Sequence, residues 1–256
     1  FSKKVYLIGS NFGPYKDEQY YLDYHQLLST YDGVSFRDYY SYNKFKDIPH
    51  VVYAPDVVFN YQTDNSSNVE HRVLFSTISL AGRNDNFAII QYWEVYRKFI
   101  QKLAKRYLEL GYKITFLSFC EPQGDFYEIN EIVKTHDFDC FKDKIEINNY
   151  NGNIEESISL IKESEIIVGT RFHSIILGWL FNKPVLPIVY DNKTLQVLKD
   201  MNLKNYASLE ELEKEKGIKK EELLESIRTA LITAYKRNFD ALENVDVKMD
   251  EQTGAT

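Results

Sequence analysis

Short apolar runs alternate with longer amphipathic segments along most of the chain, a pattern typical of βαβ units and a mainly parallel sheet. The pattern predicts strands at Val5–Ile8, Val34–Phe36, Val51–Tyr53, Val73–Leu80, Lys113–Phe119, Lys144–Ile147, Ile166–Val168 and Val185–Val189. It predicts helices at Asp17–Ser29, Asn86–Leu110, Asp125–Lys134, Ile154–Glu163, Phe172–Phe181, Thr194–Met201 and Lys220–Glu243. The expected fold class is therefore α/β.

A polar stretch, Gln62–Asn68, interrupts this alternation and is the best candidate for a linker. It divides the chain into residues 1–66, the C-terminal part of a first Rossmann-like domain, and residues 67–246, a second one. Two such domains facing each other form the glycosyltransferase-B (GT-B) arrangement, in which ligands lie beyond the carboxyl ends of the strands. The charged stretch Leu209–Glu225 is interpreted as a solvated helical face.

Composition excludes several classes of protein. The 20 Tyr and 16 Phe residues are too many for a disordered chain, and a net charge of -7 argues against nucleic acid as the main partner. Neither Cys120 nor Cys140 has metal-like spacing, and no apolar run approaches the ~20 residues that span a bilayer. HExxH, Walker and GxSxG motifs are absent from the sequence, so we expect no metal site and no P-loop chemistry.

The most informative segment is Ile166–Ser174, with the sequence IIVGTRFHS. A buried strand ends at Val168, Gly169 makes the turn, and Thr170 is expected to cap the following helix. This places Arg171 and His173 in the first helical turn, where backbone N–H groups already favour an anion. A guanidinium and an imidazole there predict a site for phosphate or carboxylate with a titratable group beside it. The alternative is a helix start whose Arg and His point to water.

Two more cations follow predicted strands. Lys193 lies in the first turn of a helix that Asp191 can cap, an unfavourable place for a lysine unless an anion is bound nearby. Arg83 follows the strand Val73–Leu80, in a Gly/Asn/Asp-rich turn. Taken singly, each could be an ordinary solvated side chain. Three cations after three strands of one sheet predict a shared anion site more strongly than any one of them.

Two polar residues complete the candidates. Glu121 follows another strand and is the carboxylate best placed to share that site, although a turn residue before Pro122 is an equal alternative. Asn11 follows the opening strand and could offer its amide to a ligand. Arg37 and Asp38 follow a strand too, and for them a structural role is favoured, with Arg37 paired to an acid.

Several motifs together resemble the polysaccharide pyruvyl transferase family. They are Gly169–Ser174, Lys183–Val185, Tyr190–Lys193, Asn11–Pro14, Phe36–Asp38, Ala54–Asp56 and Ser118–Glu121, and they occur in the family's order. The Thr-Arg-x-His-Ser element at Thr170–Ser174 is fairly specific in this company. The family's opening strand and glycine-rich loop do not occur here, so the first domain is expected to be incomplete at its N-terminus.

The resemblance implies an enzyme that transfers pyruvate from phosphoenolpyruvate to two hydroxyls of one sugar, giving a cyclic ketal on a bacterial cell-surface polysaccharide or its precursor. It implies Arg171 and His173 as the catalytic core. Their positions along the chain add five substrate-binding candidates: Arg83, Ser174, Lys193, Glu121 and Asn11. No cofactor is expected, since phosphoenolpyruvate is a substrate. The enzyme would be cytoplasmic, and a lipid-linked acceptor would bring it to the inner face of the plasma membrane.

Two rival functions stay open at this point. One is a GT-B glycosyltransferase that uses a nucleotide sugar, which would need an acidic residue for the ribose and a slot for the base. The other is a non-catalytic carbohydrate-binding protein, in which the abundant tyrosines stack on sugars. Donor binding separates the three hypotheses.

Overall fold

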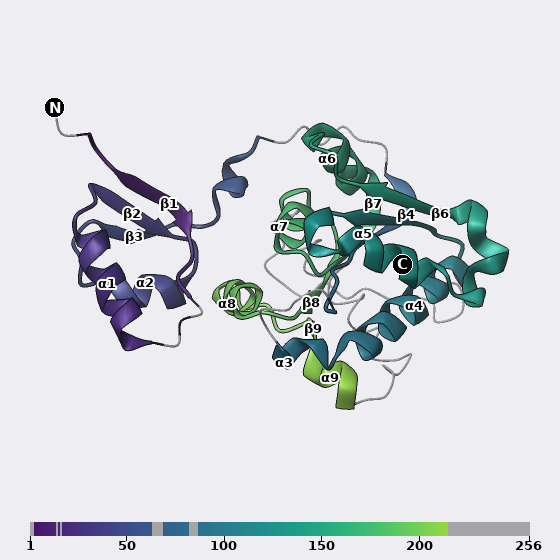
Figure 1. The fold of residues 1–256 in the computed structure, drawn as a ribbon. Helices are drawn as coiled ribbons and strands as arrows, with labels where there is room; N and C mark the ends of the chain where they lie inside the picture. The colour runs from purple at the N-terminus through teal and green to yellow at the C-terminus, as the bar shows by residue number, and fades with distance from the viewer. Residues whose placement is uncertain (1–2, 14, 16, 63–68, 82–86, 215–256) are drawn as a thin grey trace. The chain divides into compact units, whose positions relative to one another are not determined.

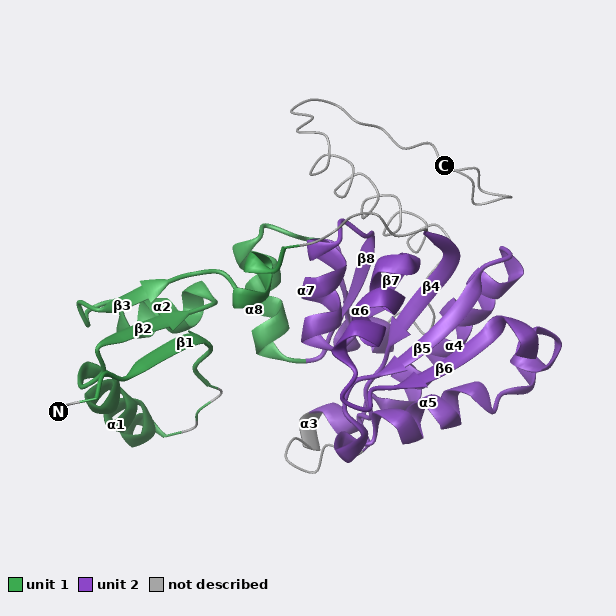
Figure 2. Ribbon diagram, turned by 90° about the horizontal axis from the view of Figure 1, so that it is seen from above, with its two compact units in different colours: residues 1–62, 191–204 green, residues 63–190, 205–256 purple. Residues whose placement is uncertain are grey.

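The computed structural model describes residues 3–13, 15, 17–62, 69–81 and 87–214. Its elements group into two compact units. The first contains residues 1–62 and 191–204, and the second contains the described residues of 63–190 and 205–256 (Figure 2). Residues 191–204 thus group with the first unit, although the sequence pattern places them within the second domain.

The first unit is a three-stranded parallel sheet with helices packed on it (Figure 1). Its strands are β1 (Tyr6–Ser10), β2 (Gly33–Phe36) and β3 (Val51–Tyr53), in that order across the sheet, and its helices are α1 (Glu18–Ser29), α2 (Tyr39–Phe45), the 3-10 helix η1 (Val57–Asn60) and α8 (Asn192–Asp200). The core lies between the sheet and α1 and α2, and is built from Leu28, Val34, Phe36, Phe45 and Val51. The backbone N–H of Tyr39 donates to Asp200 of α8 at 2.8 Å.

The second unit is a six-stranded parallel sheet in the order β6-β5-β4-β7-β8-β9. Its strands are β4 (Glu70–Ser76), β5 (Lys113–Ser118), β6 (Ile145–Asn149), β7 (Ser164–Gly169), β8 (Val185–Val189) and β9 (Ala207–Ser208). Its helices are α3 (Phe87–Ile90), α4 (Trp93–Glu109), α5 (Asp125–Val133), α6 (Ile154–Glu163), α7 (Phe172–Leu180) and α9 (Leu209–Lys214), with 3-10 helices η2 (Glu121–Gln123) and η3 (His136–Lys144).

Helices cover both faces of this sheet, because its central strands are apolar on both sides. Val73 and Phe75 of β4 face the larger core beneath α4 and α5, while Leu74 faces a second core beneath α6 and α7. Strands β4, β5 and β7 are parallel neighbours, so their carboxyl ends lie at the same edge of the sheet. Loops that follow them are thereby collected in one place.

The α/β class with parallel strands is confirmed, and several predicted bounds need correction. The strand predicted over Val73–Leu80 ends at Ser76, and Ile78 and Leu80 are buried in irregular chain. The helix predicted over Asn86–Leu110 is divided into α3 and α4, and α2 was not predicted. Gly111 has φ of 94°, as expected for a residue that ends α4. The helix predicted at Lys220–Glu243 lies outside the described residues.

The charged segment near residue 209 has an apolar side as well as a solvated one. In α9, Glu210, Glu211 and Glu213 are exposed, while Leu209 and Leu212 are buried in the larger core beside α4. Within the described ranges, none of the helices is long and apolar enough to cross a membrane.

Candidate functional site

The junction between β7 and α7 carries the most informative sequence segment. Gly169 ends β7, and a Cβ at this position would lie 2.7 Å from Ile175 Cγ1 and 3.0 Å from Ser174 Oγ, so only glycine lets α7 start this close. The cap predicted at Thr170 is wrong: Arg171 is the N-cap, with φ -75° and ψ 131° and no side-chain cap hydrogen bond. The Thr170 hydroxyl instead lies 2.9 Å from the hydroxyl of Tyr96.

Arg171 is held by two residues that follow β5, Gln123 of η2 and Asp125 at the start of α5. Its Nε donates to Asp125 Oδ2 at 2.7 Å, its Nη2 donates to Asp125 Oδ1, and its Nη1 donates to Gln123 Oε1 at 2.7 Å. Burial alone would lower the pKa of Arg171, but the hydrogen bonds and charge of Asp125 outweigh it and raise the pKa above the ordinary value. The guanidinium therefore stays charged and fixed in direction.

Asp125 reaches this position because the loop after β5 turns sharply. Gly124 has φ of 83°, a backbone conformation that favours glycine, and it immediately precedes α5. The Asp125 side chain is fully buried and also accepts from the backbone N–H of Cys120 at 3.1 Å. From sequence, Asp125 is only an acidic residue at a helix start, and nothing in its neighbourhood indicates a partner 46 positions away. Asp125 and Gln123 are therefore the site residues that sequence reasoning missed.

The side chains after Arg171 divide between solvent and core. His173 lies in the first turn of α7, as predicted, and its side chain is exposed. Ser174 is fully buried, and its hydroxyl donates to the carbonyl oxygen of Arg171 at 2.7 Å. The structure thus gives Ser174 a role in shaping the turn, while Arg171 and His173 are the two basic side chains at the N-terminal end of α7.

The remaining candidates of the second unit are Glu121 and Arg83. Glu121, exposed in η2, accepts from the side-chain amide of Asn149 at 2.7 Å, so it is tied to the end of β6. Arg83 lies outside the described residues. Its place in an anion site stays a prediction.

The other two candidates, Asn11 and Lys193, belong to the first unit. Lys193 is in the first turn of α8, which Asp191 caps by accepting from the Thr194 N–H at 3.0 Å, as predicted. Its Nζ lies 3.9 Å from Asp191 Oδ2, so the capping carboxylate offsets part of its unfavourable position. Asn11 accepts from Arg37 Nη2 at 3.1 Å.

Arg37 and Asp38 have the structural roles expected of them. Arg37 Nη1 donates to Asp56 Oδ2 at 2.6 Å, and both side chains are largely buried. Asp38 caps α2 by accepting from the N–H of Ser41 at 2.7 Å. In this way Asn11, Arg37 and Asp56 join the carboxyl ends of all three strands of the first sheet.

Among the described residues, no group of three or more His, Cys, Asp or Glu side chains could hold a metal ion. The β7–α7 junction presents a fixed guanidinium, an exposed imidazole and a helix N-terminus. Such a set suits an anion with a proton to be moved nearby.

The family model of the polysaccharide pyruvyl transferases matches residues 1–192, three quarters of the chain. The match runs from β1 to the start of α8. The chain belongs to the polysaccharide pyruvyl transferase family. Arg171, His173 and Ser174 all lie within the matched part. Among curated relatives, this family member is 24% identical over 225 residues to the amylovoran biosynthesis protein AmsJ of Erwinia amylovora. The alignment covers 80% of the chain and 54% of AmsJ, so the chain spans about half the length of that relative.

A second family, the NusA N-terminal domain, matches residues 206–256. The chain is also 57% identical over 44 residues to the transcription termination/antitermination protein NusA of Bacillus subtilis. This alignment covers 17% of the chain and 12% of NusA. The chain therefore resembles two different families on either side of about residue 200. The second match includes β9 and α9, and Leu209 and Leu212 of α9 pack into the core of the second unit.

Solved structures agree with the fold class. S. aureus MnaA, in a co-structure with UDP, has a TM-score of 0.50 and 15% identity, over 82% of this chain and 57% of that one. A putative UDP-N-acetylglucosamine 2-epimerase from Listeria monocytogenes has a TM-score of 0.50 and 11% identity, over 82% and 55%. At these identities the likeness shows the fold alone, and it confirms the Rossmann-like, GT-B type of α/β fold for this pyruvyl transferase family member.

Proposed function

We propose that this family member takes phosphoenolpyruvate as donor and transfers pyruvate to two hydroxyls of one sugar in a bacterial cell-surface polysaccharide or its precursor. The observation that carries the proposal is that a fixed Arg171 and an exposed His173 both lie at the N-terminus of α7. Family membership supplies the reaction class, and the junction supplies chemistry that suits an anionic donor.

Phosphoenolpyruvate carries a phosphate and a carboxylate, so it needs several hydrogen-bond donors in a fixed arrangement. Three of the five N–H groups of Arg171 donate to Asp125 and Gln123 within the described residues, which leaves two for ligand oxygens. Because Asp125 already holds the guanidinium, binding would not require a long side chain to be ordered. From its place in the sequence, Arg83 is proposed to add positive charge.

The proposed reaction converts phosphoenolpyruvate and a sugar diol into a cyclic ketal and inorganic phosphate. Protonation of the donor's C3 makes C2 oxocarbenium-like; one sugar hydroxyl then bonds to C2 and loses its proton. The C2–O bond to phosphate breaks, and the second hydroxyl closes the ring. Of the two hydroxyl protons, one replaces the proton added to C3 and the other leaves on the phosphate. His173 is proposed to carry protons between the hydroxyl and the donor. Arg171 is proposed to stabilise the leaving phosphate.

The test is a donor-specificity titration with the full chain. Phosphoenolpyruvate and UDP are titrated separately into the protein by calorimetry, and each is then titrated again in the presence of the other. We expect saturable phosphoenolpyruvate binding that UDP does not weaken. UDP binding without phosphoenolpyruvate binding would replace the proposal with a nucleotide-sugar transferase. Binding of sugars without either donor would indicate a carbohydrate-binding protein.

The setting of the reaction is part of the same proposal. The donor is a cytoplasmic metabolite, so a cytoplasmic enzyme is expected. A lipid-linked acceptor would bring the enzyme to the inner face of the plasma membrane, and vesicle co-sedimentation with and without such an acceptor would detect that association. No cofactor is required, because phosphoenolpyruvate supplies both the pyruvyl group and the leaving phosphate.

A further inference from the structure

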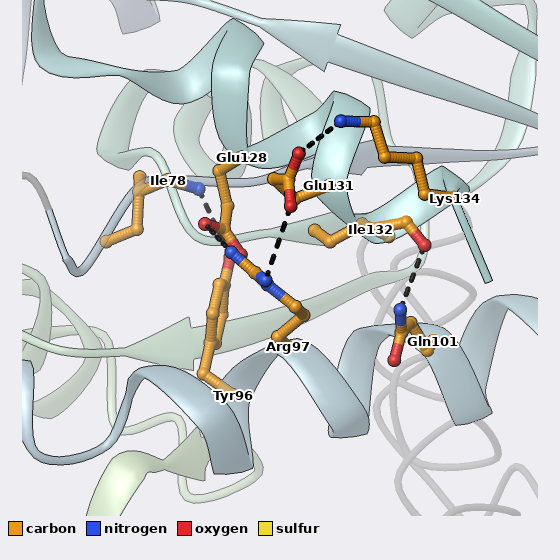
Figure 3. A network of polar contacts seen from close by, with 8 residues as sticks. All are labelled: Ile78, Tyr96, Arg97, Gln101, Glu128, Glu131, Ile132 and Lys134. Carbon is orange, nitrogen blue, oxygen red and sulfur yellow. Dashed lines mark hydrogen bonds and ion pairs between the residues drawn. The ribbon is translucent and has the colours of Figure 1, made fainter.

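We propose that Tyr96 of α4 is a positioning residue for the anion site at the β7–α7 junction, a role that rests on the proposed function. Its hydroxyl accepts from the backbone N–H of Ile78, in the loop after β4, at 3.2 Å (Figure 3). The same hydroxyl lies 2.9 Å from Thr170 Oγ1, in the loop after β7. One buried hydroxyl thus connects two of the loops at the carboxyl edge of the sheet. Thr170 is followed directly by Arg171.

The Tyr96 hydroxyl is not needed to fill the larger core of the second unit. Tyr96 is 1% exposed and its ring packs in the larger core, where phenylalanine would occupy nearly the same volume. Burial raises the pKa of Tyr96, so the phenol stays neutral and keeps a proton to share with Thr170. A polar group kept in an apolar core, with both hydrogen bonds directed at loops of the site, indicates a role in holding those loops.

The same helix also acts on Arg171 from the other side. Next to Tyr96, Arg97 donates from Nε and Nη2 to the two carboxylate oxygens of Glu128 at 2.7 and 2.8 Å, which ties α4 to α5 (Figure 3). The first residue of α5 is Asp125, which binds the Arg171 guanidinium. The side chain of Arg171 is therefore held through α5 while its backbone is held through Thr170 and Tyr96.

Tyr107 offers a matched control in the same helix. It too is fully buried in the larger core, but among the described residues its hydroxyl has no hydrogen-bond partner. Tyr96→Phe and Tyr107→Phe therefore remove the same atom from the same helix and the same kind of environment. Only the first substitution removes hydrogen bonds to loops of the site.

The first experiment measures amide hydrogen exchange across the full chain in wild type and in both variants. In Tyr96→Phe, we expect exchange to rise by about tenfold or more in peptides covering 77–81 and 170–174, because the lost bonds free those loops. Peptides covering β6 should exchange as in wild type, and Tyr107→Phe should leave both loops unchanged. Unchanged loops in a folded Tyr96→Phe protein would overturn the positioning role.

The second experiment measures whether loosening the two loops weakens the binding of phosphoenolpyruvate. Calorimetric titration with phosphoenolpyruvate should show roughly 5- to 20-fold weaker binding for Tyr96→Phe, as expected when one or two net hydrogen bonds are lost, and unchanged binding for Tyr107→Phe. Thr170→Val should weaken binding similarly, and combining it with Tyr96→Phe should add little. Faster exchange with unaltered binding would overturn the link to the anion site.

The two proposals fail in different ways. If wild type does not bind phosphoenolpyruvate, the proposed function fails, whereas the exchange data still decide whether Tyr96 holds the two loops. If wild type binds and Tyr96→Phe binds equally well while folded, the donor assignment stands and the role of Tyr96 is rejected.

Discussion

Arg171 and Asp125 form a bidentate ion pair in which Nε donates to Oδ2 at 2.7 Å and Nη2 donates to Oδ1. Asp125 is fully buried and the Arg171 side chain is 14% exposed. Removing one member leaves an uncompensated charge in the interior. Asp125→Ala should therefore lower the free energy of unfolding by about 3–5 kcal/mol, measured by chemical denaturation.

A double variant separates the charge from the packing at this pair. Arg171→Met with Asp125→Asn removes both charges together and should cost much less than Asp125→Ala alone. If the single and double variants were equally destabilised, the pair would contribute through shape only.

His173 gives a prediction about turnover without a stability change. Because the side chain is exposed, His173→Ala should leave the unfolding free energy within about 0.5 kcal/mol of wild type. Turnover should fall by roughly 10²–10⁴-fold, the usual contribution of a general acid/base, while phosphoenolpyruvate affinity stays nearly constant. His136 is also exposed and lies in η3, so His136→Ala is the control that should keep full activity. Equal losses of turnover and donor binding in His173→Ala would contradict the assigned role.

Lys183 gives a prediction about pH. It is 9% exposed, and burial lowers its pKa, so the folded protein releases the proton more readily than the unfolded chain does. Where the unfolded state binds more protons, stability rises with pH, so the unfolding free energy should increase as pH rises from the lowered pKa toward the ordinary lysine value. Lys183→Met removes this cost and should be more stable near neutral pH, with a flatter alkaline profile. An identical pH profile in the variant would show that Lys183 is solvated.

The segment that resembles NusA contributes to the core of the second unit. Leu209 is 1% exposed and packs in the larger core, so Leu209→Ala should cost about 2–5 kcal/mol of unfolding free energy. The neighbouring Glu210 is exposed, and Glu210→Ala should change the unfolding free energy by less than about 0.5 kcal/mol. Equal, negligible effects of both substitutions would show that α9 does not stabilise this unit.

Sequence patterns predicted the fold well where local and tertiary signals agree. The strand Val185–Val189, the Asp191 cap and the helix Ile154–Glu163 were placed correctly because apolar period and capping chemistry coincide there. The helix Tyr39–Phe45 was missed, since YYSYNKF has no clear helical period and is short. Its start is fixed by Asp38, whose capping role emerges from the fold.

The candidate site could be located from sequence but not completed. Arg171 and His173 follow a buried strand, and strand ends in parallel sheets gather at one edge, so their position could be predicted. Tyr96 and Asp125 could not, because a buried tyrosine in an amphipathic helix and an acid at a helix start are both common. Their contacts with Thr170 and Arg171 exist only because the order β5-β4-β7 brings distant loops together.

The central claim is that Arg171 binds phosphoenolpyruvate at the β7–α7 junction. Its most direct test is calorimetric titration of phosphoenolpyruvate into the full chain and into the charge-matched Arg171→Met, Asp125→Asn variant, with folding of both checked by circular dichroism. We predict saturable binding to wild type and none to the variant. Absence of binding to folded wild type, or equal binding to both proteins, would contradict the account.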